Sequence, residues 1–190
     1  MTGTGPTPQD LLEQERFEEA GTIYTVTAYR TLGHREMANG DDRQISGGLD
    51  RLLRATLSYR RAGRMDRCQN RAEQGILIAR DIQENVVEDP RRVAVLQEFI
   101  ADFHGISGLE GYQQAYDDTL VKLRDADLEY STSFLSSPLA DKIIGFTFYL
   151  EQFADNEIGE VAIQFDFADR VRYKKREMQG IRASIDQNTQ

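Results

Sequence analysis

A short pattern of tyrosine, arginine and glycine occurs twice, thirty residues apart, and each copy follows a helical run. The first copy contains Tyr29-Arg30, Gly33 and Ala38, and the second contains Tyr59-Arg60, Gly63 and Cys68. A helix-glycine-helix unit cannot bury its apolar face alone and is usually stacked on similar units. The pattern therefore predicts an all-α fold of antiparallel helix pairs, arranged as a short helical array or an irregular bundle.

The length of 190 residues favours one domain, large enough to enclose a core without disulfides. Only 39% of the residues are hydrophobic, but nine Phe and eight Tyr can bury large areas at few positions. The opening, Thr2 to Pro8, is rich in Thr, Gly and Pro, which is typical of a loose terminus. We expect a flexible tail over residues 1–9, one helical domain over 10–180 and a polar tail over 181–190.

The charge composition says more about the salt concentration around the protein than about a binding partner. Acidic residues number 32 against 23 basic ones, the net charge is −9, and only four of the basic residues are Lys. An acidic, Lys-poor surface resembles proteins of salt-rich cytoplasm, where salt screens repulsion between carboxylates. GC-rich codon usage is the alternative explanation. The lone Cys68, the lack of a long apolar run and the absence of a signal-peptide pattern lead us to expect a cytoplasmic protein without a membrane segment.

Helical periodicity runs through most of the chain. One apolar stripe recurs every three or four residues and comprises Met65, Cys68, Ala72, Ile76, Ala79, Ile82 and Val86. Asp89-Pro90 should end this helix and begin the next, and Gly108 should end that one. Ser137-Pro138 should begin a further helix, and Asp155-Asn156 should form a turn. No alternating run of β-branched residues predicts a strand.

The segment around Gly63 resembles one unit of the tetratricopeptide family. Tyr59 is followed by Gly63 four residues later, then by Met65 and by small residues at Cys68, Ala72 and Gly75. Cys68 and Gly75 stand where that family usually has Ala, and the closing Pro comes late, at Pro90. The long Tyr-rich helices are most similar to the SNAP-like branch of the superfamily, over residues 10–126. An unrelated helical bundle is the alternative.

The resemblance implies specific turn residues and a general function. The interhelix turns would use Tyr29, Gly33, Tyr59, Gly63 and Gly108. Proteins of this superfamily are non-catalytic scaffolds or adaptors that accept a peptide or partner helix in a groove. The resemblance therefore implies protein binding and no enzyme activity.

A direct search for chemical motifs gives no catalytic or metal-binding candidate. His34 and His104 are 70 residues apart, and neither has a Glu three residues before it. The sequence also lacks His-Glu-x-x-His, Cys-x-x-Cys, a phosphate-binding loop and a dinucleotide-binding glycine pattern. We therefore expect no catalytic residues, no metal and no cofactor.

Two basic stretches are the candidate partner-binding surfaces. The first comprises Arg60, Arg64, Arg67 and Arg71. The second runs from Arg170 to Arg176 and includes Arg172, Lys174 and Lys175. Guanidinium groups bind carboxylates and phosphates, so either stretch could hold an acidic peptide, a small anion or nucleic acid. The alternative is pairing within the chain, with Asp66, Glu73, Asp169 and Glu177. We expect another protein or peptide as partner, for example one with an acidic segment. Nucleic acid is disfavoured by the net charge of −9.

Overall fold

The computed structural model describes residues 5–34, 39–129, 134–153 and 166–187. These residues form helices and contain no strand, which confirms the predicted all-α class. The helices are α1 (Pro8–Glu13), α2 (Phe17–Leu32), α3 (Asp42–Arg61), α4 (Met65–Asn85), α5 (Pro90–Ser107), α6 (Tyr112–Asp125), α7 (Pro138–Glu151) and α9 (Phe167–Gln187).

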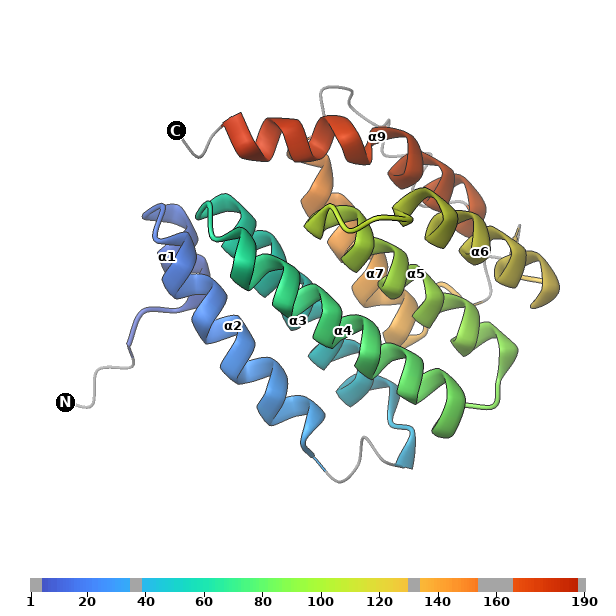
Figure 1. The fold of residues 1–190 in the computed structure, drawn as a ribbon. Coiled ribbons are helices and arrows are strands. Elements are labelled where there is room, and N and C mark those ends of the chain that lie inside the picture. The colour runs from blue at the N-terminus through green and yellow to red at the C-terminus, as the bar shows by residue number, and fades with distance from the viewer. Residues whose placement is uncertain (1–4, 35–38, 130–133, 154–165, 188–190) are drawn as a thin grey trace.

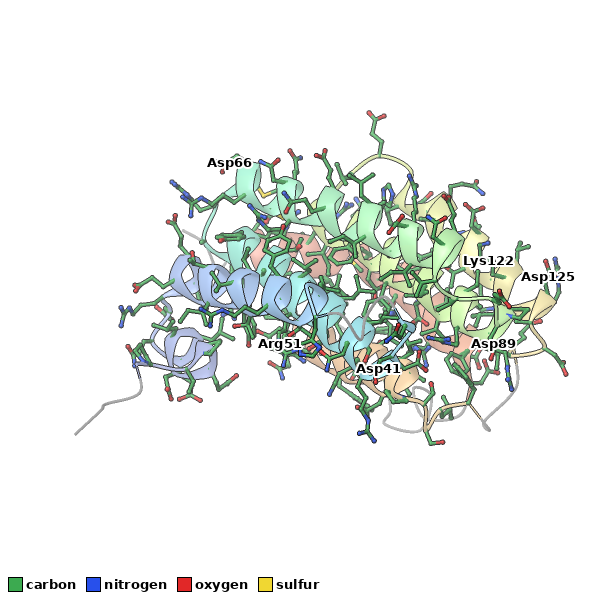
Figure 2. All side chains as sticks on the ribbon, turned by 90° about the horizontal axis from the view of Figure 1, so that it is seen from below. Asp41, Arg51, Asp66, Asp89, Lys122 and Asp125 are labelled. Atoms are coloured by element: carbon green, nitrogen blue, oxygen red, sulfur yellow. The ribbon has the colours of Figure 1, made fainter. Side chains whose placement is uncertain are left out.

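Helices α3, α5 and α7 begin at side-chain caps that satisfy free backbone N–H groups. The Asp89 carboxylate accepts from the Arg91 N–H at 3.0 Å, and Pro90 occupies the first turn of α5. Ser137 caps α7 in the same way and precedes Pro138, so both predicted helix starts are confirmed. Asp41 caps α3, and Figure 2 shows Asp41 and Asp89 beside the ends of their helices.

The turn between α3 and α4 contains Gly63, whose φ of +66° lies in the left-handed region that favours glycine. The Arg64 N–H donates to the Tyr59 carbonyl at 2.9 Å and closes the turn. Gly108 ends α5 with a φ of +73°. Gly33 differs, because its φ of −78° is an ordinary right-handed value. Gly33 is the C-cap of α2, and the next described α-helix, α3, begins at Asp42.

Helices α2 to α6 pack in chain order as antiparallel neighbours (Figure 1). The last two described helices depart from that order, because α7 and α9 both pack against α3 and α5. Helices α3 and α5 therefore lie at the centre, and most of their residues are buried. Contacts between elements so distant in the sequence fill the middle of the molecule and make it a bundle rather than an open array.

Small residues allow α4 to lie close to its neighbours, as the predicted stripe requires. Cys68 and Ala72 are fully buried. Gly75 faces the ring of Phe103 on α5, and a Cβ at Gly75 would lie 2.2 Å from that ring. A side chain at this position would force the two helices apart.

The two ends of the described fold extend beyond the predicted domain limits. Helix α1 begins at Pro8, behind a capping box formed by Thr7 and Asp10. Helix α9 continues to Gln187, and Ile185 is only 1% exposed, so residues 181–187 are helical rather than part of a polar tail. The predicted turn at Asp155-Asn156 lies outside the described residues. In the described helices, no segment is both long and apolar enough to cross a membrane.

Candidate functional site

Arg60, the first residue of the predicted arginine surface, is buried at the end of α3. Its guanidinium donates to the Ile106 carbonyl at 2.8 Å and to the Asp186 carboxylate at 2.5 Å. Arg60 therefore ties α3 to α5 and α9. A partner cannot reach this side chain in the folded protein, which corrects the prediction that Arg60 belongs to a binding surface.

The other three arginines of this stretch remain on the surface but already have partners on α2. Arg64 and Arg67 lie 3.4 Å and 3.0 Å from the Glu18 carboxylate. Arg71 donates to the Tyr29 hydroxyl at 2.7 Å and also contacts Gln74. None of these contacts involves Asp66 or Glu73, the partners in the alternative of pairing within the chain. The arginines join α4 to α2 because the helices lie side by side, which the sequence alone does not show.

Some residues of the second basic stretch lie on the surface and others lie in the core. Arg172 pairs with Glu129 at 2.7 Å and with Asp169 at 2.9 Å, the latter as the sequence suggested. Lys175 lies 2.6 Å from Asp117. Lys174, between them, has no exposed side-chain surface. Burial removes Lys174 from the predicted binding surface, and this part of the prediction was wrong.

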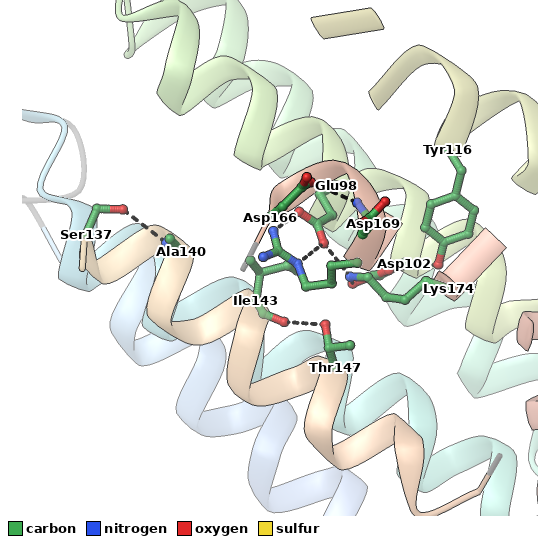
Figure 3. A network of polar contacts seen from close by, with 11 residues as sticks. Glu98, Asp102, Tyr116, Ser137, Ala140, Ile143, Thr147, Asp166, Asp169 and Lys174 are labelled. Carbon is green, nitrogen blue, oxygen red and sulfur yellow. Dashed lines mark hydrogen bonds and ion pairs between the residues drawn. The ribbon is translucent and has the colours of Figure 1, made fainter. Parts of the chain in front are cut away.

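Lys174 belongs to a buried polar cluster that joins α5, α6 and α9 (Figure 3). Its ammonium lies 2.7 Å from Glu98 and 2.6 Å from Asp102. The Arg170 guanidinium donates twice to Glu98, at 2.8 Å and 2.6 Å, and the Tyr116 hydroxyl donates to Asp102 at 2.8 Å. All five side chains are fully buried. Two cations thus balance two carboxylates inside the core.

The pKa values of the two carboxyl groups in the buried polar cluster are shifted in opposite directions from their ordinary values. Burial opposes ionisation of Glu98, but the charges of Arg170 and Lys174 outweigh it and lower the pKa of Glu98 to about 2. Burial raises the pKa of Asp102 to about 6, because Lys174 compensates only in part and the charge of Glu98 adds to the effect. Burial likewise raises the pKa of Tyr116 well above its usual value.

The buried polar cluster is enclosed by the core and serves to fix α9 on α5. Its members show a signal that sequence reasoning missed: Glu98 and Asp102 are four residues apart, as are Arg170 and Lys174. Residues four apart share one face of a helix, so each helix presents a pair of like charges to the other. Such complementary pairs could have suggested the contact, although not its burial.

A groove of about 470 Å³ lies on the surface between α2 and α4. Its lining is mainly apolar and consists of Tyr29, Leu32, Gly33, Leu77, Ile78, Asp81 and Ile82. We call this the α2/α4 groove. Leu77 is 65% exposed and Tyr29 is 39% exposed, and both are among the few large apolar side chains that reach solvent in the described part of the chain. The sequence placed Leu77 outside the apolar stripe of α4 and gave no sign that α2 would lie beside it.

Polar side chains lie at both ends of the α2/α4 groove. Asp81 is the one acidic residue in its lining, and the Asp81 carboxylate accepts a hydrogen bond from the Asn85 amide at 2.8 Å. At the opposite end, Tyr29, Arg71 and Gln74 contact one another. Over the described ranges, no three His, Cys, Asp or Glu side chains are placed to hold a metal ion.

The comparisons with known proteins give no relative to guide the interpretation. No family model matches the chain, and neither a curated protein nor a solved structure matches it.

Proposed function

We propose that the protein is a non-catalytic interaction module that binds an amphipathic helix of a partner protein in the α2/α4 groove. The observation that carries this proposal is the exposure of Leu77 and Tyr29 on facing helices, with an apolar groove between them. Two parallel helix ridges with a groove between them are a common docking surface for a third helix.

The exposed apolar side chains at the α2/α4 groove form one continuous patch, unlike scattered apolar residues on a protein surface. Single exposed apolar residues need no explanation, but a contiguous apolar patch marks an interaction site. Val26 is 44% exposed and lies three residues before Tyr29, on the same side of α2. A docked helix could therefore extend its apolar contact along α2 beyond the groove itself.

Charge favours a partner helix that carries a basic residue. The net charge of −9 attracts a basic partner at long range, and Asp81 offers a carboxylate in the groove lining. The expected acidic segment has less support, because Arg60 is buried and Arg64 and Arg67 already pair with Glu18. We retain the cytoplasmic, salt-rich setting and the likeness to helical-repeat adaptors as parts of this proposal.

Site-specific crosslinking tests the docking surface directly. A photoreactive amino acid at position 77, or at position 121 as control, would be irradiated in a lysate of the source organism at its native salt concentration. Val121 is a suitable control because it is 45% exposed but lies on α6, outside the α2/α4 groove. Position 77 should yield a specific crosslinked peptide that position 121 does not, and mass spectrometry would identify it.

The identified segment must then bind as a synthetic peptide. Titration calorimetry should show saturable binding that Leu77→Asp abolishes and Val121→Asp leaves unchanged. Leu77 is largely exposed, so its replacement should not unfold the protein. Crosslinks to a second copy of this chain, or a peptide that binds Leu77→Asp equally well, would exclude the proposed partner helix.

A further inference from the structure

A second hollow, of about 430 Å³, lies where the first turns of α3 and α7 meet. Its lining combines polar and charged groups from the two helix starts: Arg43, Ser46, Ser136, Pro138, Asp141 and Lys142. We call it the α3/α7 pocket. Both helices direct the positive end of their dipoles toward their first turns, which favours a negative group nearby.

Ser46 gives the α3/α7 pocket an unsatisfied buried hydroxyl. Its side chain is fully buried, yet Ser46 Oγ has no hydrogen-bond partner. Buried helical hydroxyls usually donate to the carbonyl four residues earlier. Others in this protein do so, namely those of Thr56, Ser107, Thr119 and Thr147. Ser46 is the exception among them, and it lines the pocket, where a bound ligand could accept its hydrogen.

The charged groups in the lining can hold one oxyanion. Arg43 is an exposed residue, and the ion pairs found among the described residues do not include it. Lys142 pairs only loosely, with the adjacent Asp141 at 3.5 Å. The lining therefore carries two cations and one carboxylate. Asp41, which caps the first turn of α3, limits the positive field there, so a ligand of low charge suits the pocket better than a polyphosphate.

We propose that the α3/α7 pocket binds a small hydroxylated organic anion through its phosphate or carboxylate group. Arg43 and Lys142 bind the oxyanion, Ser46 donates a hydrogen bond to it, and Asp141 accepts one from a hydroxyl of the ligand. The pocket volume lies within the range of small-molecule sites. This site is separate from the α2/α4 groove and does not depend on the proposed partner helix.

Titration of the isotope-labelled protein by NMR tests this site at constant ionic strength. The probes are glycerol 3-phosphate, glycerate and, as a neutral control, glycerol, each at millimolar concentration. At least one anion should shift the amide signals of Ser46 and Leu139 saturably, and glycerol should not. The tighter of the two anions identifies the preferred group. If neither anion gives a saturable shift at these amides, the proposal is wrong.

Matched charge variants distinguish binding in the α3/α7 pocket from attraction of the anion to the overall charge of the protein. Arg43→Gln and Lys142→Gln should each weaken binding roughly fivefold to tenfold, since each removes a charge-assisted contact. Lys122→Gln removes the same charge from α6, away from the pocket, and should leave the affinity unchanged. Equal weakening by Lys122→Gln and Lys142→Gln would show that only the overall charge matters, which would overturn the proposal.

Ser46→Ala should affect folding stability and anion binding differently. Loss of an unsatisfied buried hydroxyl should leave the melting temperature of the free protein unchanged or raise it. The same change should weaken binding of the anion. A lower melting temperature with unchanged binding would mean that the hydroxyl supports the fold and not the ligand, contrary to the proposal.

Discussion

The ammonium of Lys174 lies 2.6 Å from the Asp102 carboxylate, although the two residues are 72 positions apart and both side chains are fully buried. Glu98 approaches the same ammonium at 2.7 Å, so one lysine of α9 contacts both carboxylates of α5, while Arg170 supplies the second cation. The final described helix is thus attached to the centre of the bundle by charge as well as by apolar packing.

Removal of Lys174 should therefore destabilise the protein strongly. Lys174→Met leaves Asp102 without its cation in the core, and loss of one partner from a buried ion pair costs about 3–5 kcal/mol of unfolding free energy. Lys175→Met, the neighbouring control, breaks a partly exposed pair with Asp117 and should cost less than about 1 kcal/mol. Urea unfolding measures both. Similar losses in the two variants would contradict the assigned burial.

The pH dependence of stability should reflect the opposed shifts of Asp102 and Glu98. The pKa of Asp102 rises from its ordinary 3.8 to about 6 on folding, so the folded state binds more protons between these values. Lowering the pH from about 6 toward 4 should then favour the folded state. The pKa of Glu98 falls from 4.5 to about 2, so its contribution is present above pH 4.5 and is lost as the pH falls toward 2.

Unfolding free energies measured across this range should therefore pass through a maximum between about pH 4 and pH 6. Asp102→Asn should remove the gain on acidification from pH 6, because the titrating group is gone. Measurement in molar KCl controls for general repulsion among surface carboxylates, which acid also relieves. A maximum that persists unchanged in Asp102→Asn would assign it to other groups.

Gly75 and Gly180 provide a matched pair of glycine substitutions. A Cβ at Gly75 would lie 2.2 Å from the Phe103 ring, so Gly75→Ala should cost about 1–3 kcal/mol through overpacking. Nothing lies within 4 Å of a Cβ at Gly180 in α9, so Gly180→Ala should stabilise the protein by about 0.5–1 kcal/mol. Thermal or urea unfolding of the two variants should give effects of opposite sign.

Salt should stabilise the protein if its acidic, Lys-poor composition is an adaptation. The melting temperature should rise substantially between low and molar KCl, since screening weakens repulsion among carboxylates at a net charge of −9. The buried polar cluster lies away from solvent ions and should contribute little to this rise. A flat or falling melting curve would favour GC-rich codon usage as the reason for the composition.

Much of the helix pattern could be predicted because its signals are local. Asp89-Pro90 and Ser137-Pro138 begin helices through contacts within four residues, and Gly63 makes a turn through its own backbone freedom. Asp41 likewise begins α3 through a contact within three residues, since its carboxylate accepts from the Arg43 and Gln44 N–H groups. Each of these features depends on the few residues around it.

The candidate sites could not be predicted in the same way. The basic stretches suggested exposed surfaces, yet Arg60 and Lys174 are buried because α9 returns to pack on α3 and α5. Leu77 faces a groove only because α2 lies beside α4, and Ser46 lines a pocket only because α7 begins next to α3.

The sequence by itself determined the helical class, the helix starts at Asp89-Pro90 and Ser137-Pro138 and the glycine turn at Gly63, since backbone conformation and capping act over a few residues. Only the tertiary structure decided which charges are buried, which apolar side chains remain exposed and where the hollows lie. These properties depend on helices that are distant in the sequence, such as those that bring Tyr29 to Arg71, 42 positions later, and Arg60 to Asp186, 126 positions later. Their packing is a property of the whole chain, because each helix face is covered by a neighbour that its own sequence does not specify.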